Sequence, residues 1–246
     1  MSQQAVNDEA ERQRLLDPEL VDRNMKPQTT RQYLGSTLLG GQPTWSSWTV
    51  QIGLLLAFVP LWTTLATHPA GLFTYHPAIQ SFAIILFIQG IILLQPQPKD
   101  FKTKQKGLKL HQIVQYTALP LIVAGSAVIV YNKIVNKGKH LYSWHGWCGT
   151  LTLFLIVAQI TFGAIIVYSP LTQLVGGSNK AKQIWKFHRM SGYVTLSLLL
   201  LTPLLAVDSD WIQNNTTRVE RIVMTGGLVL VAIGVTARIS TQKLGF

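Results

Sequence analysis

The chain has 246 residues, of which 48% are hydrophobic and only 13% are charged, and its formal net charge is +11 at pH 7. A soluble domain carries about twice that share of charged residues, so the composition excludes an ordinary soluble protein and indicates an integral membrane protein. A single cysteine, Cys148, excludes an internal disulfide.

Six apolar runs are long enough to cross a membrane as helices, which need about 20 residues each. They cover residues 48–67, 77–95, 111–131, 145–168, 188–207 and 220–238. The runs are continuously apolar rather than alternating, which favours helices over the strands of a barrel. We therefore predict an all-α membrane protein with six transmembrane helices.

The predicted organisation is one transmembrane domain, residues 45–240, between two tails. Residues 1–44 are polar and mixed in charge, which is typical of a disordered tail, and residues 241–246 form a short second tail. The stretch from Glu11 to Leu16, ERQRLL, fits an acidic dileucine sorting pattern, although so short a pattern also arises by chance. It favours an endomembrane (vacuole, endosome or ER) over the plasma membrane.

Lysine and arginine are concentrated on one side of the predicted membrane domain. They gather in residues 1–44, 96–110, 169–189 and 238–246, whereas the connections on the opposite side carry fewer. Because cytoplasmic loops hold an excess of these residues, both termini are expected in the cytoplasm. This distribution explains the high net charge without a nucleic-acid partner, and the expected partner is the lipid bilayer.

Four of the six histidines stand at or just before the first residue of an apolar run: His76, His111, His145 and His188. Alternating helix direction puts His76 and His145 in one layer, called here the outer layer, and His111 and His188 in an inner layer. A lone interfacial histidine is more often hydrogen-bonded than a ligand, but imidazole in hydrocarbon is uncommon without a partner. Two facing imidazoles can supply both axial nitrogens of a haem iron. Four histidines in matched layers therefore favour two bound metals or haems.

Small and amide residues recur at fixed spacings after these histidines. The residues four positions further on are Gln80, Gln115, Gly149 and Gly192. Gly90 and Gly125 follow His76 and His111 by fourteen positions. We expect all four glycines to leave room for flat porphyrins, because glycine lets a group approach the backbone. The alternative is that small residues let membrane helices pack closely.

The interior of the six runs lacks Asp, Glu and Lys. Proton-coupled transporters and pumps commonly need such residues inside the membrane. The pattern thus favours electron transfer through haems whose axial positions are both filled by protein. A histidine-lined metal or proton transporter without haem is the alternative.

The residues resemble those of the eukaryotic cytochrome b561 family, in particular its short six-helix members without an extracellular domain. The resemblance covers residues 48–238. It rests on segments in the family's order and spacing: His76-Pro77, Lys109-Leu110-His111 with Gln115, Ser143-Trp144-His145-Gly146-Trp147, and Phe187-His188 with Gly192. It implies a central four-helix bundle that holds two haem b groups, with His76 and His145 as axial ligands of one haem iron and His111 and His188 of the other.

The same resemblance implies an oxidoreductase that moves electrons across the membrane. The expected donor is cytoplasmic ascorbate or a similar small reductant, and the expected acceptor is monodehydroascorbate or a ferric chelate. By position, Lys109, Lys106 and Lys182 are candidates for binding the reductant, with topology-setting surface charge as an equal alternative. The family's ascorbate-associated motif, with a tyrosine and closely spaced arginines, has no counterpart here. Association into a homodimer is left open.

Overall fold

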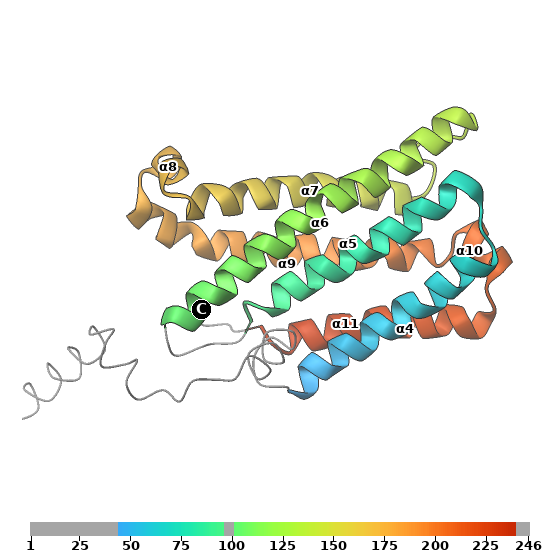
Figure 1. Cartoon of the computed structure of the whole chain (residues 1–246), viewed down its shortest axis with the longest axis horizontal. Helices are drawn as coiled ribbons and strands as arrows, with labels where there is room; N and C mark the ends of the chain where they lie inside the picture. The colour runs from blue at the N-terminus through green and yellow to red at the C-terminus, as the bar shows by residue number, and fades with distance from the viewer. Residues whose placement is uncertain (1–43, 96–100, 240–246) are drawn as a thin grey trace, which may run out of the picture. The chain divides into compact units, whose positions relative to one another are not determined.

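The structure, a computed structural model, describes residues 44–95 and 101–239 (Figure 1). The predicted tails, residues 1–44 and 241–246, therefore lie outside the described residues, apart from Thr44. The dileucine-like stretch falls in the same undescribed part.

All regular structure in the described residues is helical, which confirms the predicted fold class. In chain order the elements are α4 (Trp45–Thr67), η1 (Gly71–Thr74), α5 (Tyr75–Ile92), α6 (Phe101–Val135), α7 (Trp144–Val167), α8 (Ser169–Thr172), η2 (Gln173–Val175), α9 (Ser178–Ala206), α10 (Asp210–Asn215) and α11 (Arg218–Thr236). Six of them, namely α4, α5, α6, α7, α9 and α11, are long and apolar enough to cross a membrane. The four short helical elements were not predicted.

Polar side chains fix where several helices begin. Thr44 and Ser47 form a capping box at the start of α4, and the Ser143 hydroxyl accepts from the Gly146 N–H at the start of α7. At the start of α11 the Glu220 carboxylate accepts from the Thr217 N–H at 2.6 Å. Each cap satisfies N–H groups that have no partner within the helix. Glu220 is thus a capping residue at the end of a transmembrane helix.

Two predicted helix starts are wrong. We expected helices to begin at His111 and His188, but α6 begins at Phe101 and α9 at Ser178. Both extensions are rich in lysine and lie before the apolar run, so hydropathy did not identify them as parts of helices. The two histidines consequently sit on continuous helix rather than at helix ends.

The long helices pack in three pairs: α4 with α11, α5 with α6, and α7 with α9 (Figure 1). In the first pair the backbones themselves touch. A Cβ atom placed on Gly53 would lie 2.7 Å from the Gly227 carbonyl oxygen, and one on Gly234 would lie 2.7 Å from the Ser46 carbonyl oxygen. Small residues therefore hold this pair together, as is common between membrane helices.

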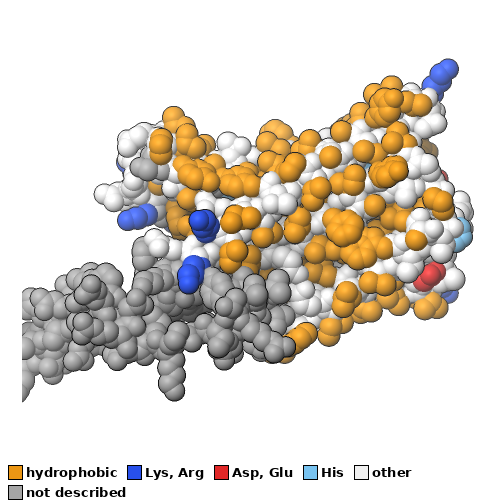
Figure 2. All heavy atoms as spheres, in the orientation of Figure 1, with side chains coloured by type: hydrophobic (Ala, Val, Ile, Leu, Met, Phe, Trp, Pro, Cys, Tyr) orange, Lys and Arg blue, Asp and Glu red, His pale blue; other side chains and the backbone are white. Residues whose placement is uncertain are grey.

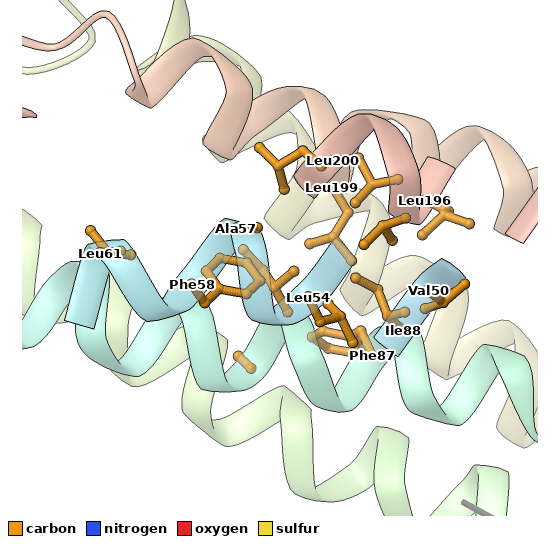
Figure 3. Packing of buried hydrophobic residues seen from close by; sticks show 14 of the residues in the cluster. Val50, Leu54, Ala57, Phe58, Leu61, Phe87, Ile88, Leu196, Leu199 and Leu200 are labelled. Carbon is orange, nitrogen blue, oxygen red and sulfur yellow. The ribbon is translucent and has the colours of Figure 1, made fainter. Parts of the chain in front are cut away.

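The buried hydrophobic cluster joins the α4–α11 pair to α5 and α9. Figure 3 shows its members packing side by side: Val50, Leu54, Ala57, Phe58 and Leu61 from α4, Phe87 and Ile88 from α5, and Leu196, Leu199 and Leu200 from α9. Further members, Ala118 and Ile122 of α6 and Ile156 of α7, extend the cluster to the other two helices that carry histidines.

Large hydrophobic side chains also cover the outside of the helices. Figure 2 shows them spread over the visible face, with charged side chains toward the two ends of the helices. They include Leu55 of α4, Phe82 of α5, Phe154 of α7 and Val194 of α9, all exposed. An apolar exterior of this extent suits contact with lipid rather than water.

Candidate functional site

The two histidines of the predicted outer layer meet across the bundle. His76 stands in the first turn of α5 and His145 in the first turn of α7. Their ring centres are 6.2 Å apart and the ring planes cross at 80°. Two imidazoles bonded to one metal through bonds of about 2 Å would have ring centres roughly 6 Å apart. The outer layer thus has the spacing of two nitrogen ligands on opposite sides of one metal.

Three of the four histidines donate their Nδ1–H to a backbone carbonyl of the neighbouring helix. His76 donates to Gly125 at 2.8 Å, His111 to Gly90 at 2.8 Å, and His145 to Thr202 at 2.9 Å. A carbonyl oxygen can only accept, so the proton must sit on Nδ1 in each case. The Nε2 lone pair is then available to a metal, which is how metal-ligating histidines are commonly oriented.

The carbonyl acceptors follow one rule of position. Gly90 follows His76 by fourteen residues, Gly125 follows His111 by fourteen, and Thr202 follows His188 by fourteen. In the antiparallel pair of α5 and α6, each helix therefore fixes the histidine of the other. Such reciprocity indicates that the same local design is used twice within one helix pair.

The inner layer consists of His111 on α6 and His188 on α9, and both side chains are partly buried. The His188 ring meets the edge of Phe162 at 5.7 Å between ring centres. A Cβ atom on Gly163 would lie 3.0 Å from Cε1 of His188, so α7 supports this imidazole directly.

The expectation that the four glycines make room for porphyrins is wrong, because each glycine faces a side chain of the helix it is paired with. A Cβ atom on Gly90 would lie 2.7 Å from Nε2 of Gln115, and one on Gly125 would lie 3.1 Å from Cδ of Gln80. These two glycines receive the glutamines of the paired helix, and Gln80 also donates to Ser126 at 2.9 Å. The glutamines hold α5 and α6 together through polar contacts.

The other two glycines also face side chains of the paired helix, here between α7 and α9. A Cβ atom on Gly149 would lie 3.3 Å from Cγ2 of Thr202, and one on Gly192 would lie 2.8 Å from Nε2 of Gln159. In α5 and α6 the large residue stands four positions after the histidine and the small one fourteen after it. In α7 and α9 this order is reversed. The close-packing alternative therefore explains all four glycines.

These residues fit a flat group held by two histidines. The helices that carry the histidines of each layer, α5 with α7 and α6 with α9, are not the pairs that pack along each other. Within the described residues no three His, Cys, Asp or Glu side chains converge on one point, and the histidine rings that meet there are those of His76 and His145. Two facing nitrogens from separate helix pairs are the donor set that haem iron takes.

The candidate lysines lie beyond the inner layer, at the ends of α6 and α9 that point away from the outer layer. Lys106 and Lys109 stand on the early turns of α6 and Lys182 on the second turn of α9, and all three are exposed. The helix extensions that were not predicted carry all three lysines.

Sequence reasoning missed Gln159 and Thr202. Gln159 donates to the His188 carbonyl oxygen at 2.6 Å, and Thr202 supplies the acceptor for His145. Extending the fourteen-residue spacing from the first two helices to His145 and His188 would have identified both positions. The residues at these two positions are not glycines, so their type alone does not mark them.

The sequence matches the profile of the family described as eukaryotic cytochrome b561 over residues 75–214, a range that includes all four histidines. It is 27% identical over 163 residues to "Probable transmembrane reductase CYB561D1" of Mus musculus, covering 65% of this chain and 69% of that protein. It is 28% identical over 163 residues to "Plasma membrane ascorbate-dependent reductase CYBRD1" of Mus musculus, covering 63% and 54%. It is 27% identical over 174 residues to "Transmembrane ascorbate ferrireductase 2" of Arabidopsis thaliana, covering 67% and 73%.

The family match spans more than half of the chain and coincides with the helices that carry the paired histidines. The six apolar helices agree with a chain that crosses the bilayer several times. The resemblance inferred from the sequence is thereby confirmed. The chain is an integral multi-pass membrane protein and belongs to the eukaryotic cytochrome b561 family.

Proposed function

We propose that this protein is a transmembrane reductase that carries electrons between two haem b groups, one in each histidine layer. The electrons come from ascorbate or a similar small reductant and pass to monodehydroascorbate or a ferric chelate on the opposite side. The observation that carries the proposal is the outer layer, where His76 and His145 face each other at 6.2 Å with both Nδ1 atoms already bonded. The names of the relatives, which include ascorbate-dependent reductases, support the reaction class.

In this proposal His76 and His145 hold one haem, and His111 and His188 hold the other. Haem iron would supply one-electron chemistry. Each ascorbate monoanion that gives up an electron also releases a proton, and monodehydroascorbate takes up a proton when it is reduced, whereas a ferric chelate takes up the electron alone. With two histidines holding each haem, oxygen would be kept from the iron and the group would suit outer-sphere electron transfer. The carbonyls of Gly125 and Thr202 hold the outer imidazoles in one tautomer and one orientation.

The proposed orientation places both termini and the inner layer on the cytoplasmic side, following the distribution of lysine and arginine. Lys106, Lys109 and Lys182 would then attract an anionic reductant to the inner layer. We propose an endomembrane location on the basis of the dileucine-like stretch.

The test is an absorption spectrum of the purified protein with and without ascorbate, together with the haem content per chain. The proposal expects a b-type spectrum on reduction and two haems per chain. In His145→Ala the outer haem loses a ligand, so about half of the haem should be lost or change its spectrum. His140→Ala is the matched control, because His140 is exposed in the connection before α7 and belongs to neither pair.

A correctly folded preparation without haem would refute the proposal. If the same preparation moved zinc or protons into liposomes, the histidine-lined transporter would replace the reductase. Equal haem content together with an unchanged spectrum in wild type, His145→Ala and His140→Ala would refute the assignment of the ligand.

A further inference from the structure

His188 departs from the rule that fixes the other three histidines. By position its acceptor should be the carbonyl of Gln159, which follows His145 by fourteen residues. Instead, Nδ1 of His188 is buried and has no hydrogen-bond partner among the described residues. The fourth member of a repeated design is therefore built differently.

The Gln159 side chain holds His188 in another way, through a hydrogen bond to its backbone. Its Nε2 donates to the backbone carbonyl of His188 at 2.6 Å, and its Oε1 accepts from the Ser191 hydroxyl at 3.0 Å. The small Gly192 provides the space, since a Cβ atom there would lie 2.8 Å from the same Nε2. Gln159 thus hydrogen-bonds the backbone of the turn that carries His188, rather than its imidazole.

The difference has a chemical consequence for a ligand. A carbonyl that accepts from Nδ1–H makes an imidazole a stronger electron donor to its metal and fixes its orientation. His111 has this support from Gly90, whereas Nδ1 of His188 has no acceptor in the described part of the chain and its ring packs against Phe162 and Gly163. The inner layer therefore combines one strong and one weak donor, and the outer layer combines two strong donors.

We propose that Gln159 is a positioning residue of the inner layer. It holds the backbone of His188, whose Nδ1 lacks the carbonyl bond that orients the other three histidines, and so keeps this weakly donating ligand within reach of its metal. This inference rests on the proposed function, because it concerns one of the two haems. It identifies a role for a residue that touches no substrate and does not ligate the metal.

The test compares Gln159→Met, which keeps a long side chain but removes the amide donor, with Ser191→Ala. The second variant removes the hydroxyl bonds to Oε1 of Gln159 and to the Phe187 and His188 carbonyl oxygens, but leaves the Gln159 amide in place. Redox titration of purified protein resolves the two haems, and the transition missing from His188→Ala belongs to the inner layer. In Gln159→Met the inner haem should favour the reduced state by about tenfold, which is a rise of about 59 mV for a one-electron couple. The outer haem should not change, and Ser191→Ala should match wild type.

Carbon monoxide gives a second readout that is independent of electron transfer. It binds reduced haem iron only where an axial position opens, so it should bind the inner haem of Gln159→Met and neither haem of wild type. Gln159→Asn, whose shorter amide does not reach the His188 carbonyl, should behave in the same way if Gln159→Met fails to fold.

The two proposals fail in different ways. Wild-type protein without haem would overturn both. Two haems with the inner potential and carbon monoxide binding unchanged in Gln159→Met or Gln159→Asn would overturn the role of Gln159 alone. A shift of equal size in Ser191→Ala would also overturn it, because that variant retains the bond from the Gln159 amide to the His188 carbonyl.

Discussion

Adjacent glycines on α11 allow a sharp test of how the α4–α11 pair is held together. A Cβ atom on Gly227 would meet backbone atoms of α4, namely the Ala57 nitrogen, the Gly53 carbonyl oxygen at 2.6 Å and the Leu56 carbonyl carbon at 2.9 Å. Backbone cannot turn aside as a side chain can, so Gly227→Ala forces the two helices apart. A Cβ atom on Gly226 would meet nothing within 4 Å.

Both substitutions gain helix propensity, worth about 1 kcal/mol for glycine to alanine. Only Gly227→Ala also incurs the cost of overpacking, about 1–3 kcal/mol. Taking a value near 2 kcal/mol, Gly227→Ala should unfold about 4–8 °C below Gly226→Ala in a chain of this size. Thermal unfolding in detergent, followed by circular dichroism, measures the difference. Equal unfolding temperatures for the two variants would show that the backbones of α4 and α11 are not in the contact described.

The remaining predictions concern the site. Gly90→Ala should lower stability because its Cβ atom displaces the buried Gln115 amide from its bond to the α5 backbone, at a cost of about 1–3 kcal/mol, and Gln115→Ala in the same chain should recover part of the loss; strictly additive effects on the unfolding temperature would contradict the contact. Replacing Lys106, Lys109 and Lys182 together by glutamine should raise KM for ascorbate several-fold with little change in kcat, because each exposed charge contributes about 1 kcal/mol or less to attraction in water. The difference should fade at high ionic strength, and a KM equal to that of wild type at low salt would exclude these lysines from the reductant site.

The number and type of the helices could be predicted because hydrocarbon imposes a length and an apolarity on every spanning segment. The starts of α6 and α9 could not, since their lysine-rich first turns lie outside the apolar runs and hydropathy identifies only the latter. The pairing of His76 with His145 followed from helix direction alone and agrees with the contact between their rings.

The role of the glycines could not be predicted for a different reason. A sequence shows that a position is small but not which neighbour fills the space, and that depends on a second helix. Gly90 and Gly192 both looked like gaps for a ligand, whereas each accommodates a glutamine of its paired helix. The exception at His188 was invisible for the same reason, because it consists of a backbone contact rather than a residue type.

The fourteen-residue spacing has a consequence for energetics. Fourteen helical residues separate the two layers by about 21 Å, roughly two-thirds of the hydrocarbon thickness. In the proposed reductase, an electron that passes between His111 and His145 would therefore move through most of the transmembrane voltage. A potential of 100 mV acts on a whole crossing with about 2.3 kcal/mol, so it would contribute about 1.6 kcal/mol to this step. The reaction would be electrogenic, and the membrane voltage alone would change its equilibrium more than tenfold.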